Sequence, residues 1–412
     1  MSRSVEHLKR FRFVEYRIFN FSHYPKHVSN LKTYAFKDLI IAEVMKEYSY
    51  VLWVDSSSSN LCWYKGKEYD LHYTLPSNSS VRGIGFSCSH MKYLDYFGFL
   101  NESTFIDLRR NEVSQVKVVT AITQDHFHEC GRLLEKFKKH FKGEQIILYD
   151  LGLEEYAVKF LKKLKFVEYR KFDFSYYPSF VSNAKKYGFK WLVVAEVLKE
   201  YKSVIWADAS LRFLKSNFMK NINKLLNCYN GKSEDHKKME QRKIEKYHLF
   251  NNRNDKNLFQ FNIEHCYKSQ VLMHIPTFHG ILSTANPRFL EYLPTDKSKY
   301  KGETSRQHGT GFVLFVKTKD TVENIMKWAV LCSLTEDCIA PVSWYPCEGI
   351  FNKHNWFANY EICYRFDQTL LTVLLHNNNN YDNRNYVTEL KGYAYFNGNR
   401  LKKMNRLLKY KA

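Results

Sequence analysis

The segment Val204-Ile-Trp-Ala-Asp208-Ala-Ser210-Leu-Arg212 decides the fold, because a short apolar run ends abruptly at a carboxylate. A run of this length between polar residues is typical of a buried strand. In open α/β sheets, ligands bind beyond the carboxyl ends of the strands, which is where Asp208 would lie. The segment therefore predicts a buried strand with a ligand site at its end.

Upstream of this segment, strand patterns alternate with helical patterns. This alternation predicts an α/β, Rossmann-like fold, with a mostly parallel sheet and helices on both faces. Downstream, ordered segments begin at 270, 280 and 310, a helix is predicted at 321–334, and a buried helix at 365–375. The predicted strands are 116–123, 144–150, 166–174 and 204–208, and the helices between them are 127–141, 154–164 and 184–201.

The chain also resembles itself at an offset of 153 residues. Residues 13–57 align with 166–210 without a gap and are identical at about 28 of 45 positions. Such self-similarity indicates a duplication, either an evolutionary remnant or the product of a fused gene model. The N-terminal copy begins only at the third strand, so we expect the second copy alone to form a pocket.

These patterns divide the chain into four parts. We predict a truncated repeat at 1–62, a connecting segment at 63–115 to which the sequence assigns no structure, an α/β domain at 116–390 and a basic tail at 391–412. Within the domain, residues 217–257 are rich in Lys, Asn and Glu and are expected to form a loop or a solvated helix.

The charge balance narrows the partners without selecting one. With 63 basic and 42 acidic residues the formal net charge is +21, which favours a polyanion, an acidic membrane surface or an anionic ligand as partner. A solvated basic surface without such a partner is the interpretation that we favour. The basic residues are dispersed and no nucleic-acid motif accompanies them, so we expect no nucleic-acid partner. Apolar runs stop at Glu43 and Glu196, and the N-terminus has no apolar core, so we expect neither a membrane span nor a signal peptide.

Four of the nine cysteines crowd into one short region: Cys332, Cys338, Cys347 and Cys363. Their spacing lacks the C-x2-C pattern of a zinc site. They form either two disulfides, which requires an oxidising compartment, or reduced and buried thiols.

Asp208, Ser210 and the residues around them resemble the Asp-x-Asp element of GT-A-type nucleotide-sugar transferases, which holds a divalent cation against the donor diphosphate. More narrowly, residues 204–213, 328–341 and 363–375 together resemble an uncharacterised family, expanded in nematodes, that is grouped with those transferases. The resemblance covers about 116–386, with a partial copy at 8–62.

This resemblance implies a GT-A-like fold, a nucleotide-sugar donor, a glycan or other hydroxyl acceptor, and Golgi or secretory membranes as the location. It also implies Mn²⁺ or another divalent cation at Asp208. Ser210 replaces the second acid of the element, however, and one carboxylate with one hydroxyl is a weaker cation site.

Several residues are candidates for binding the donor. Arg212 can match phosphate oxygens with two parallel hydrogen bonds, and Lys190 can approach phosphates from the start of a helix. By resemblance, Thr120 and Asp150 would contact the base and ribose, and Gln368 would lie near the sugar. The alternative for Asp208, Thr120 and Asp150 is an ordinary turn residue, and for Lys190 it is a solvated basic face.

An inverting transfer needs a carboxylate that takes the proton of the acceptor hydroxyl. Asp367, in an Asp-Gln pair that resembles a late element of these transferases, is the first candidate. Glu336 and Asp337 are the second, and for all three a helix cap or an ion pair is the alternative. The N-terminal copy retains Asp55 but has Ser59 at the position of Arg212, so we expect it to be inactive.

The function that follows is a glycosyltransferase of the hexosyltransferase type, which moves a sugar from a nucleoside-diphosphate donor to a hydroxyl acceptor. Two alternatives stay open. One is a catalytically degenerate relative of such enzymes, and the other is a basic protein that binds polyanions.

Overall fold

The computed structural model forms two compact units, Met1–Ser59 and Asn60–Ala412. The structure describes residues 15, 17–30, 35–51, 61–111, 113, 115–216, 218–226, 262, 266, 270–300, 305–341, 347, 363–388 and 394–396. None of the described helices is both long and apolar enough to cross a membrane.

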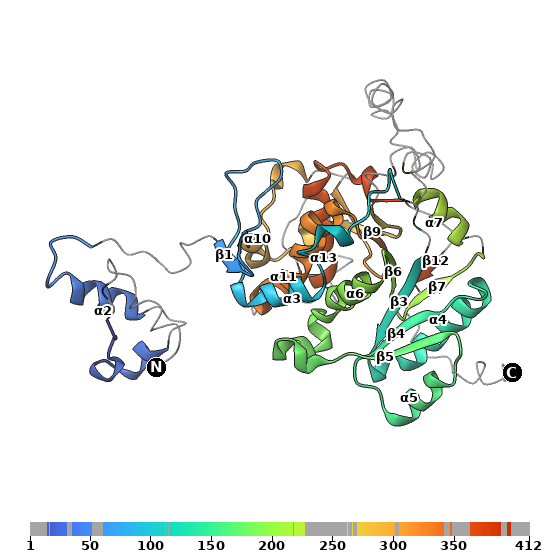
Figure 1. Cartoon of the computed structure of the whole chain (residues 1–412), viewed down its shortest axis with the longest axis horizontal. Coiled ribbons are helices and arrows are strands. Elements are labelled where there is room, and N and C mark those ends of the chain that lie inside the picture. The colour runs from blue at the N-terminus through green and yellow to red at the C-terminus, as the bar shows by residue number, and fades with distance from the viewer. Residues whose placement is uncertain are drawn as a thin grey trace, which may run out of the picture. The chain divides into compact units, whose positions relative to one another are not determined.

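A six-stranded sheet organises the second unit, in the order β5-β4-β3-β6-β11-β8 (Figure 1). Within this sheet β5, β4, β3 and β6 run parallel to one another, whereas β11 runs antiparallel to both β6 and β8. The prediction of four consecutive strands of one mainly parallel sheet is therefore confirmed. The strands are β3 (Val116–Ile122), β4 (Ile146–Asp150), β5 (Val167–Lys171), β6 (Ser203–Ala207), β8 (Val271–Met273) and β11 (Phe312–Val316).

Helices cover both faces of this sheet, as predicted. On one face, α4 (Phe127–His140) and α5 (Glu155–Lys162) bury apolar side chains such as Leu133 and Leu161 against alternate residues of the strands. On the other face lie α6 (Phe189–Glu200), the π-helical turn η14 (Thr321–Met326), α11 (Lys327–Ser333) and α13 (Phe366–Asn378). A mixed α/β fold results.

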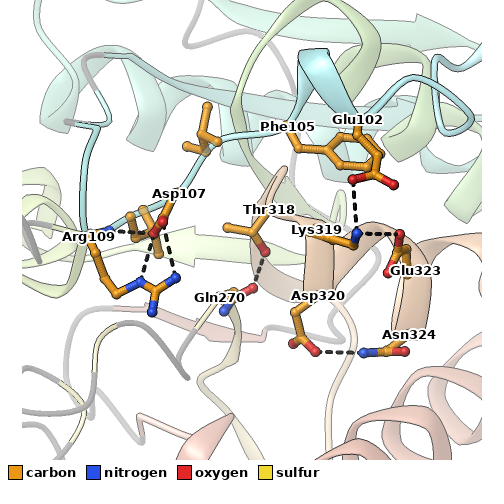
Figure 2. Close-up of a pocket in the computed structure, with 12 residues that line it drawn as sticks. Glu102, Phe105, Asp107, Arg109, Gln270, Thr318, Lys319, Asp320, Glu323 and Asn324 are labelled. Carbon is orange, nitrogen blue, oxygen red and sulfur yellow. Dashed lines mark hydrogen bonds and ion pairs between the residues drawn. The ribbon is translucent and has the colours of Figure 1, made fainter.

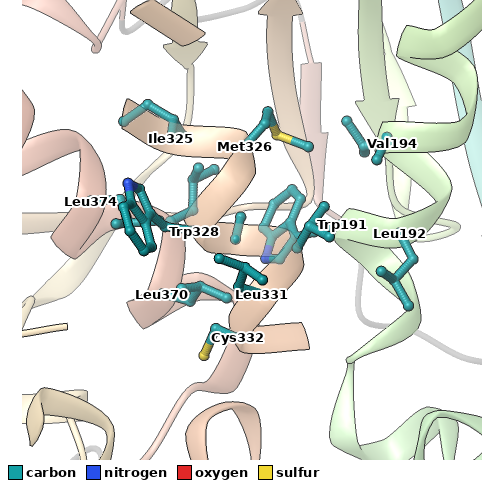
Figure 3. Packing of buried hydrophobic residues seen from close by; sticks show 14 of the residues in the cluster. Trp191, Leu192, Val194, Ile325, Met326, Trp328, Leu331, Cys332, Leu370 and Leu374 are labelled. Carbon is teal, nitrogen blue, oxygen red and sulfur yellow. The ribbon is translucent and has the colours of Figure 1, made fainter. Parts of the chain in front are cut away.

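Helix α6 lies between the sheet and the other helices on its face. Trp191 packs among Met326, Leu331 and Leu370 from neighbouring helices, as Figure 3 shows. Nine of its twelve residues are buried, so α6 is apolar nearly all round and shows no amphipathic period. It begins at Phe189 rather than at the predicted 184, because Tyr187 adopts a left-handed conformation (φ 56°) after the 3-10 turn Ala184–Lys186.

Residues 61–111 belong to the second unit, whereas the sequence left 63–115 without a structural assignment and placed 61 and 62 in the truncated repeat. They form the hairpin β1 (Leu61–Tyr64) and β2 (Lys67–Asp70) and the helix α3 (Met91–Tyr96). Side chains such as Tyr73, Leu94 and Phe97 are buried in the same core as α6 and α11. The segment is therefore a structural part of the unit, held by its many apolar and aromatic side chains.

The predicted basic tail also contributes to the sheet region. Its residues Ala394–Phe396 form β12, which pairs antiparallel with β7 (Leu211–Phe213) directly after Asp208. The predicted domain end at residue 390 was therefore too early. A three-residue strand in a basic segment has too few residues to show a strand period.

The disulfide interpretation of the cysteine cluster is confirmed. Cys332 pairs with Cys338 and Cys347 with Cys363, with Cα atoms 5.2 and 5.1 Å apart. A further disulfide, Cys62–Cys88, was not predicted from the sequence. Among the described cysteines, Cys130 carries a free thiol, and it is buried.

The first unit contains two 3-10 turns, Phe21–His23 and Lys26–Ser29, and the helix α2 (Ala35–Val44). The helix confirms the element expected from the repeat. The strand expected before it, at 13–21 in correspondence with 166–174, is not formed at the described residues 17–21. The strand expected after it, at 51–55, lies outside the described residues except for Val51.

Candidate functional site

Three charged side chains from separate elements meet at the carboxyl edge of the sheet. Asp208 follows β6, Lys190 lies in the first turn of α6, and Asp367 lies in the first turn of α13. The ammonium Nζ of Lys190 is 2.7 Å from Oδ2 of Asp367 and 3.2 Å from Oδ1 of Asp208. The sequence reasoning singled out all three residues, and the structure brings them together.

Lys190 is the centre of this group, and its side chain is only 3% exposed. Burial alone would lower the pKa of the Lys190 ammonium, but the charges and hydrogen bonds of Asp208 and Asp367 outweigh burial and raise it. The lysine is therefore a fixed positive charge. It also donates to Oγ1 of Thr310 at 3.3 Å, in the turn between β10 (Arg306–His308) and β11.

The two carboxylates differ in access. The side chain of Asp367 is 9% exposed and also accepts a 2.7 Å hydrogen bond from Thr310, whereas the side chain of Asp208 is 38% exposed. Oδ1 of Asp208 accepts a 2.6 Å bond from the indole of Trp206, which orients the carboxylate. Asp208 is therefore the carboxylate of this pair that a ligand can reach.

Two of the residues with a strained backbone lie beside this group. Tyr187 (φ 56°) and Phe366 (φ 30°) are non-glycine residues in the left-handed region, next to α6 and at the start of α13. Their rings lie 5.7 Å apart. Such conformations cost about 1 to 3 kcal/mol each and are found where a site needs a particular geometry.

Tyr187 is a site residue that sequence reasoning missed. It is 43% exposed, and burial of its hydroxyl followed by the nearby charges of Asp367 and Asp208 raises its pKa. An exposed aromatic ring beside charged groups is suited to packing against a sugar or a base. Its left-handed backbone has no signature in the sequence beyond the glycine that follows.

Gln368, next to Asp367, makes two hydrogen bonds near the site. Its amide Nε2 donates to the backbone oxygen of His308 at 3.1 Å, and its Oε1 accepts a 3.2 Å bond from Arg365. Gln368 thus connects the start of α13 to the strand that precedes Thr310. Arg365 brings a second cation near Asp367: burial lowers the pKa of this guanidinium, and the charge of Asp367 opposes that shift.

Arg212 has a different environment from the one predicted. It is 1% exposed, and its guanidinium donates to the backbone oxygens of Ala209, Leu211 and Glu129 at 2.7 to 3.2 Å. A guanidinium bonded to backbone carbonyls in this way holds the chain after β6 in place. We therefore assign Arg212 to the fold rather than to the donor site.

Thr120 and Asp150 also lie inside the fold. Thr120 is fully buried within β3, two residues before the end of the strand. Asp150, at the end of β4, accepts bonds from the backbone N–H groups of Gly152 and Leu153 and from the hydroxyl of Tyr169, at 2.6 to 2.7 Å. These contacts match the turn-residue interpretation of Asp150.

Glu336 and Asp337, the second pair of catalytic candidates, lie on the short helix α12 (Glu336–Ile339). Glu336 forms an ion pair with Lys186, and Asp337 accepts from Arg288 at 2.6 Å. Neither contacts Lys190, Asp208 or Asp367 in the described part of the chain, so these contacts match the ion-pair interpretation.

The residues at the carboxyl edge do not fit a divalent cation well. Such a cation needs several hard oxygen ligands, but here a lysine ammonium already bridges the two carboxylates, and Ser210 stands where a second acid would be. Within the described ranges, no three His, Cys, Asp or Glu side chains are grouped as metal ligands.

A cavity of about 650 Å³ lies at the opposite edge of the sheet. Its lining includes Thr318–Asp320, just after Val316, which pairs with the first residue of β6. Its charged side chains pair with one another, including Asp107 with Arg109 and Lys319 with Glu102 (Figure 2). It is therefore not the predicted donor site, which belongs at the other ends of these strands.

The chain is similar in part to a known protein family. A family model described as "Protein of unknown function (DUF1647)" matches residues 1–42 and 61–195, which include most of α2 and most of the elements from β1 to α6. No curated protein matches the chain.

Similar solved structures include three glycosyltransferases. The bifunctional glycosyltransferase WbbM in its apo form is 12% identical, with a TM-score of 0.35, over 69% of this chain and 40% of that chain. The galactosyltransferase LgtC, in complex with donor and acceptor sugar analogues, is 10% identical, with a TM-score of 0.28, over 63% of this chain and 70% of that chain. The core-mannan synthase CmsA/Ktr4 from Aspergillus fumigatus, in its Mn/GDP form, is 8% identical, with a TM-score of 0.32, over 65% of this chain and 72% of that chain.

Proposed function

We propose that the second unit binds a nucleoside-diphosphate sugar at the carboxyl edge of its sheet and transfers the sugar to a hydroxyl acceptor such as a glycan. The observation that carries this proposal is the meeting of Asp208, Lys190 and Asp367 at that edge. Ligands of open α/β sheets bind at this edge, and ionisable groups gathered there are typical of functional sites.

The structure supports a different assignment of roles from the one expected from the sequence. Because Asp367 is buried and bonded to Lys190 and Thr310, it acts as a positioning residue. Asp208 is the exposed carboxylate, so it takes the acceptor proton in an inverting transfer. The acceptor oxygen then bonds to the anomeric carbon as the bond from that carbon to the diphosphate breaks.

A second candidate function is nucleotide-sugar binding without transfer. Two observations favour it: Ser210 replaces the second acid, and Lys190 neutralises both carboxylates of the site. In this case the chain would be a degenerate relative of the transferases, with a donor pocket but no efficient catalytic base.

Calorimetric titration with UDP-glucose and GDP-mannose tests the proposal. One of the two donors should bind saturably, and Asp208→Ala should weaken binding by about 1 to 3 kcal/mol, because a charge-assisted hydrogen bond to a donor hydroxyl is lost. Asp55→Ala, the same change at the matching position of the N-terminal copy, should leave binding unchanged.

The same samples separate the alternatives. Release of free nucleoside diphosphate in the presence of acceptor glycans indicates transfer, and saturable binding without release indicates the degenerate relative. Equal effects of the two substitutions, or weak binding with steep salt dependence and no preference for one nucleotide, would contradict the proposal and favour a polyanion-binding protein.

The disulfides support a proposal about location. Three pairs among the described cysteines require an oxidising compartment, such as the lumen of the secretory pathway. Asn78 and Asn101 lie in exposed turns, each followed two residues later by serine, as N-glycosylation requires.

The gel mobility of the chain from secretory cells tests this location. Removal of N-glycans should increase that mobility, and Asn78→Gln should reduce the change. The proposal would be contradicted if the chain produced in the cytosol, with reduced cysteines, were as thermally stable as the chain produced in secretory cells.

A further inference from the structure

Lys190 occupies the space between the two carboxylates at the carboxyl edge. Its ammonium donates to Oδ2 of Asp367 at 2.7 Å and to Oγ1 of Thr310 at 3.3 Å, and it forms an ion pair with Oδ1 of Asp208 at 3.2 Å. The ammonium is therefore held by three separate residues. A lysine held in this way does not move aside easily, because two adjacent carboxylates would lose the charge that lies between them.

The charges of the site balance without a metal ion. Asp208 and Asp367 carry two negative charges, and Lys190 and Arg365 carry two positive charges. Arg365 comes two residues before Asp367 and cannot lose its proton in a protein. Two protein cations thus supply the charge that one divalent ion would bring.

A divalent ion would compete directly with Lys190. It would bind oxygens of the same two carboxylates, at distances of about 2 to 2.6 Å, and would therefore lie close to the ammonium. Ser210 offers only a neutral hydroxyl to offset this repulsion. The contacts of Lys190 thus weigh against a metal ion at this position.

We infer that Lys190, with Arg365, takes the place of the divalent cation in the donor site, so that a nucleoside diphosphate binds without metal. This inference rests on the proposed function, because it concerns the same site. It assigns to Lys190 the task of holding Asp208 and Asp367 together, which a bridging metal ion would otherwise perform.

Wild-type protein provides the first test. We expect the Kd for UDP or GDP to change by less than about twofold between buffer with EDTA and buffer with Mn²⁺. A loss of affinity of about tenfold or more in EDTA would overturn the inference. This comparison needs no variant, so it holds even if substitutions at Lys190 prevent folding.

Lys190→Ala provides the second test, with Lys37→Ala at the matching position of α2 as the control. Removal of the ammonium leaves two adjacent carboxylates, so Lys190→Ala should gain Mn²⁺ binding, measured without nucleotide from the loss of the free-ion electron paramagnetic resonance signal. Wild type and Lys37→Ala should show no such binding. Equal Mn²⁺ binding by wild type and Lys190→Ala would overturn the inference, as would no binding by a folded Lys190→Ala protein.

The two tests also separate this inference from the proposed function. If neither donor nucleotide binds under any condition, the proposed function fails. The Mn²⁺ titration of Lys190→Ala, which contains no nucleotide, still decides whether Lys190 occupies a cation position.

Discussion

The N-terminal copy and the second copy of the repeated segment form the same local contacts in different surroundings. Arg17 forms a two-bond ion pair with Glu47, and Arg170 forms the same pair with Glu200, at the same offset of 153 residues. Phe19 stacks on Tyr24 as Phe172 stacks on Tyr177, with ring centroids 5.0 Å apart in both. Local structure therefore follows the sequence, whichever unit contains it.

The burial of side chains differs between the two copies, although their sequences match. Helix α2 has no buried residue, whereas nine residues of the matching helix α6 are buried. The difference arises because β3, β4 and α11, which surround α6, have no counterpart among the described residues of the first unit. The comparison shows that a site at the end of β6 depends on these neighbours and not on the repeated segment alone.

Matched leucine substitutions should give the largest difference in stability between the two copies. Leu192 on α6 is fully buried, and Leu39 is the same residue at the matching position of α2. We expect Leu192→Ala to lower the free energy of unfolding of the second unit by about 2 to 5 kcal/mol, because it leaves a cavity in the core. Leu39→Ala should change stability by no more than about 0.5 kcal/mol.

Denaturant unfolding, followed by tryptophan fluorescence, measures both variants. Equal losses of stability in the two variants would show that α2 is buried against a partner surface. They would contradict the interpretation that only the second copy contributes to a core. A small loss for Leu192→Ala would contradict the packing of α6 described above.

Acid should destabilise the second unit in particular. Burial lowers the pKa of His274 and His376 to about 3, and of His90 and His279 to about 4. Below pH 6.5 the unfolded chain binds protons at these histidines while the folded chain does not, so stability falls as pH decreases from 6.5 toward 4.

The expected loss is about 1 to 2 kcal/mol for each histidine between pH 7 and pH 5. His23 and His27 of the first unit are exposed, so this loss should appear in the melting of the second unit. Thermal melts at several pH values, with His376→Phe as a variant, measure the effect. A melting temperature that does not change between pH 7 and pH 5 would contradict the burial of these side chains.

The main elements of the fold could be predicted because strand and helix periods are local properties of the sequence. Both the strand that ends just before Asp208 and the buried helix that carries Asp367 could be predicted in this way. The structure of residues 63–111 could not be predicted, because they are held in the core by scattered aromatic side chains rather than by a regular period.

The site was predicted less completely, since its geometry depends on contacts between distant elements. Lys190 and Asp367 are separated by 177 positions, and no spacing in the sequence reveals that they bond. Arg212 was assigned to the donor site from the sequence but is bonded to backbone carbonyls. A phosphate-binding arginine and an arginine of this kind have the same local sequence. Tyr187 was missed because its backbone conformation, rather than its residue type, brings it beside the site.

Hydrogen–deuterium exchange with and without a bound sugar nucleotide tests the central claim most directly, because it locates the ligand without a substitution. We expect new protection in peptides that cover 187–190, 206–210 and 365–368, and none in 20–44. Protection confined to 102–109 and 318–324, which line the cavity at the opposite edge, or protection in the N-terminal copy, would contradict a donor site at the carboxyl edge.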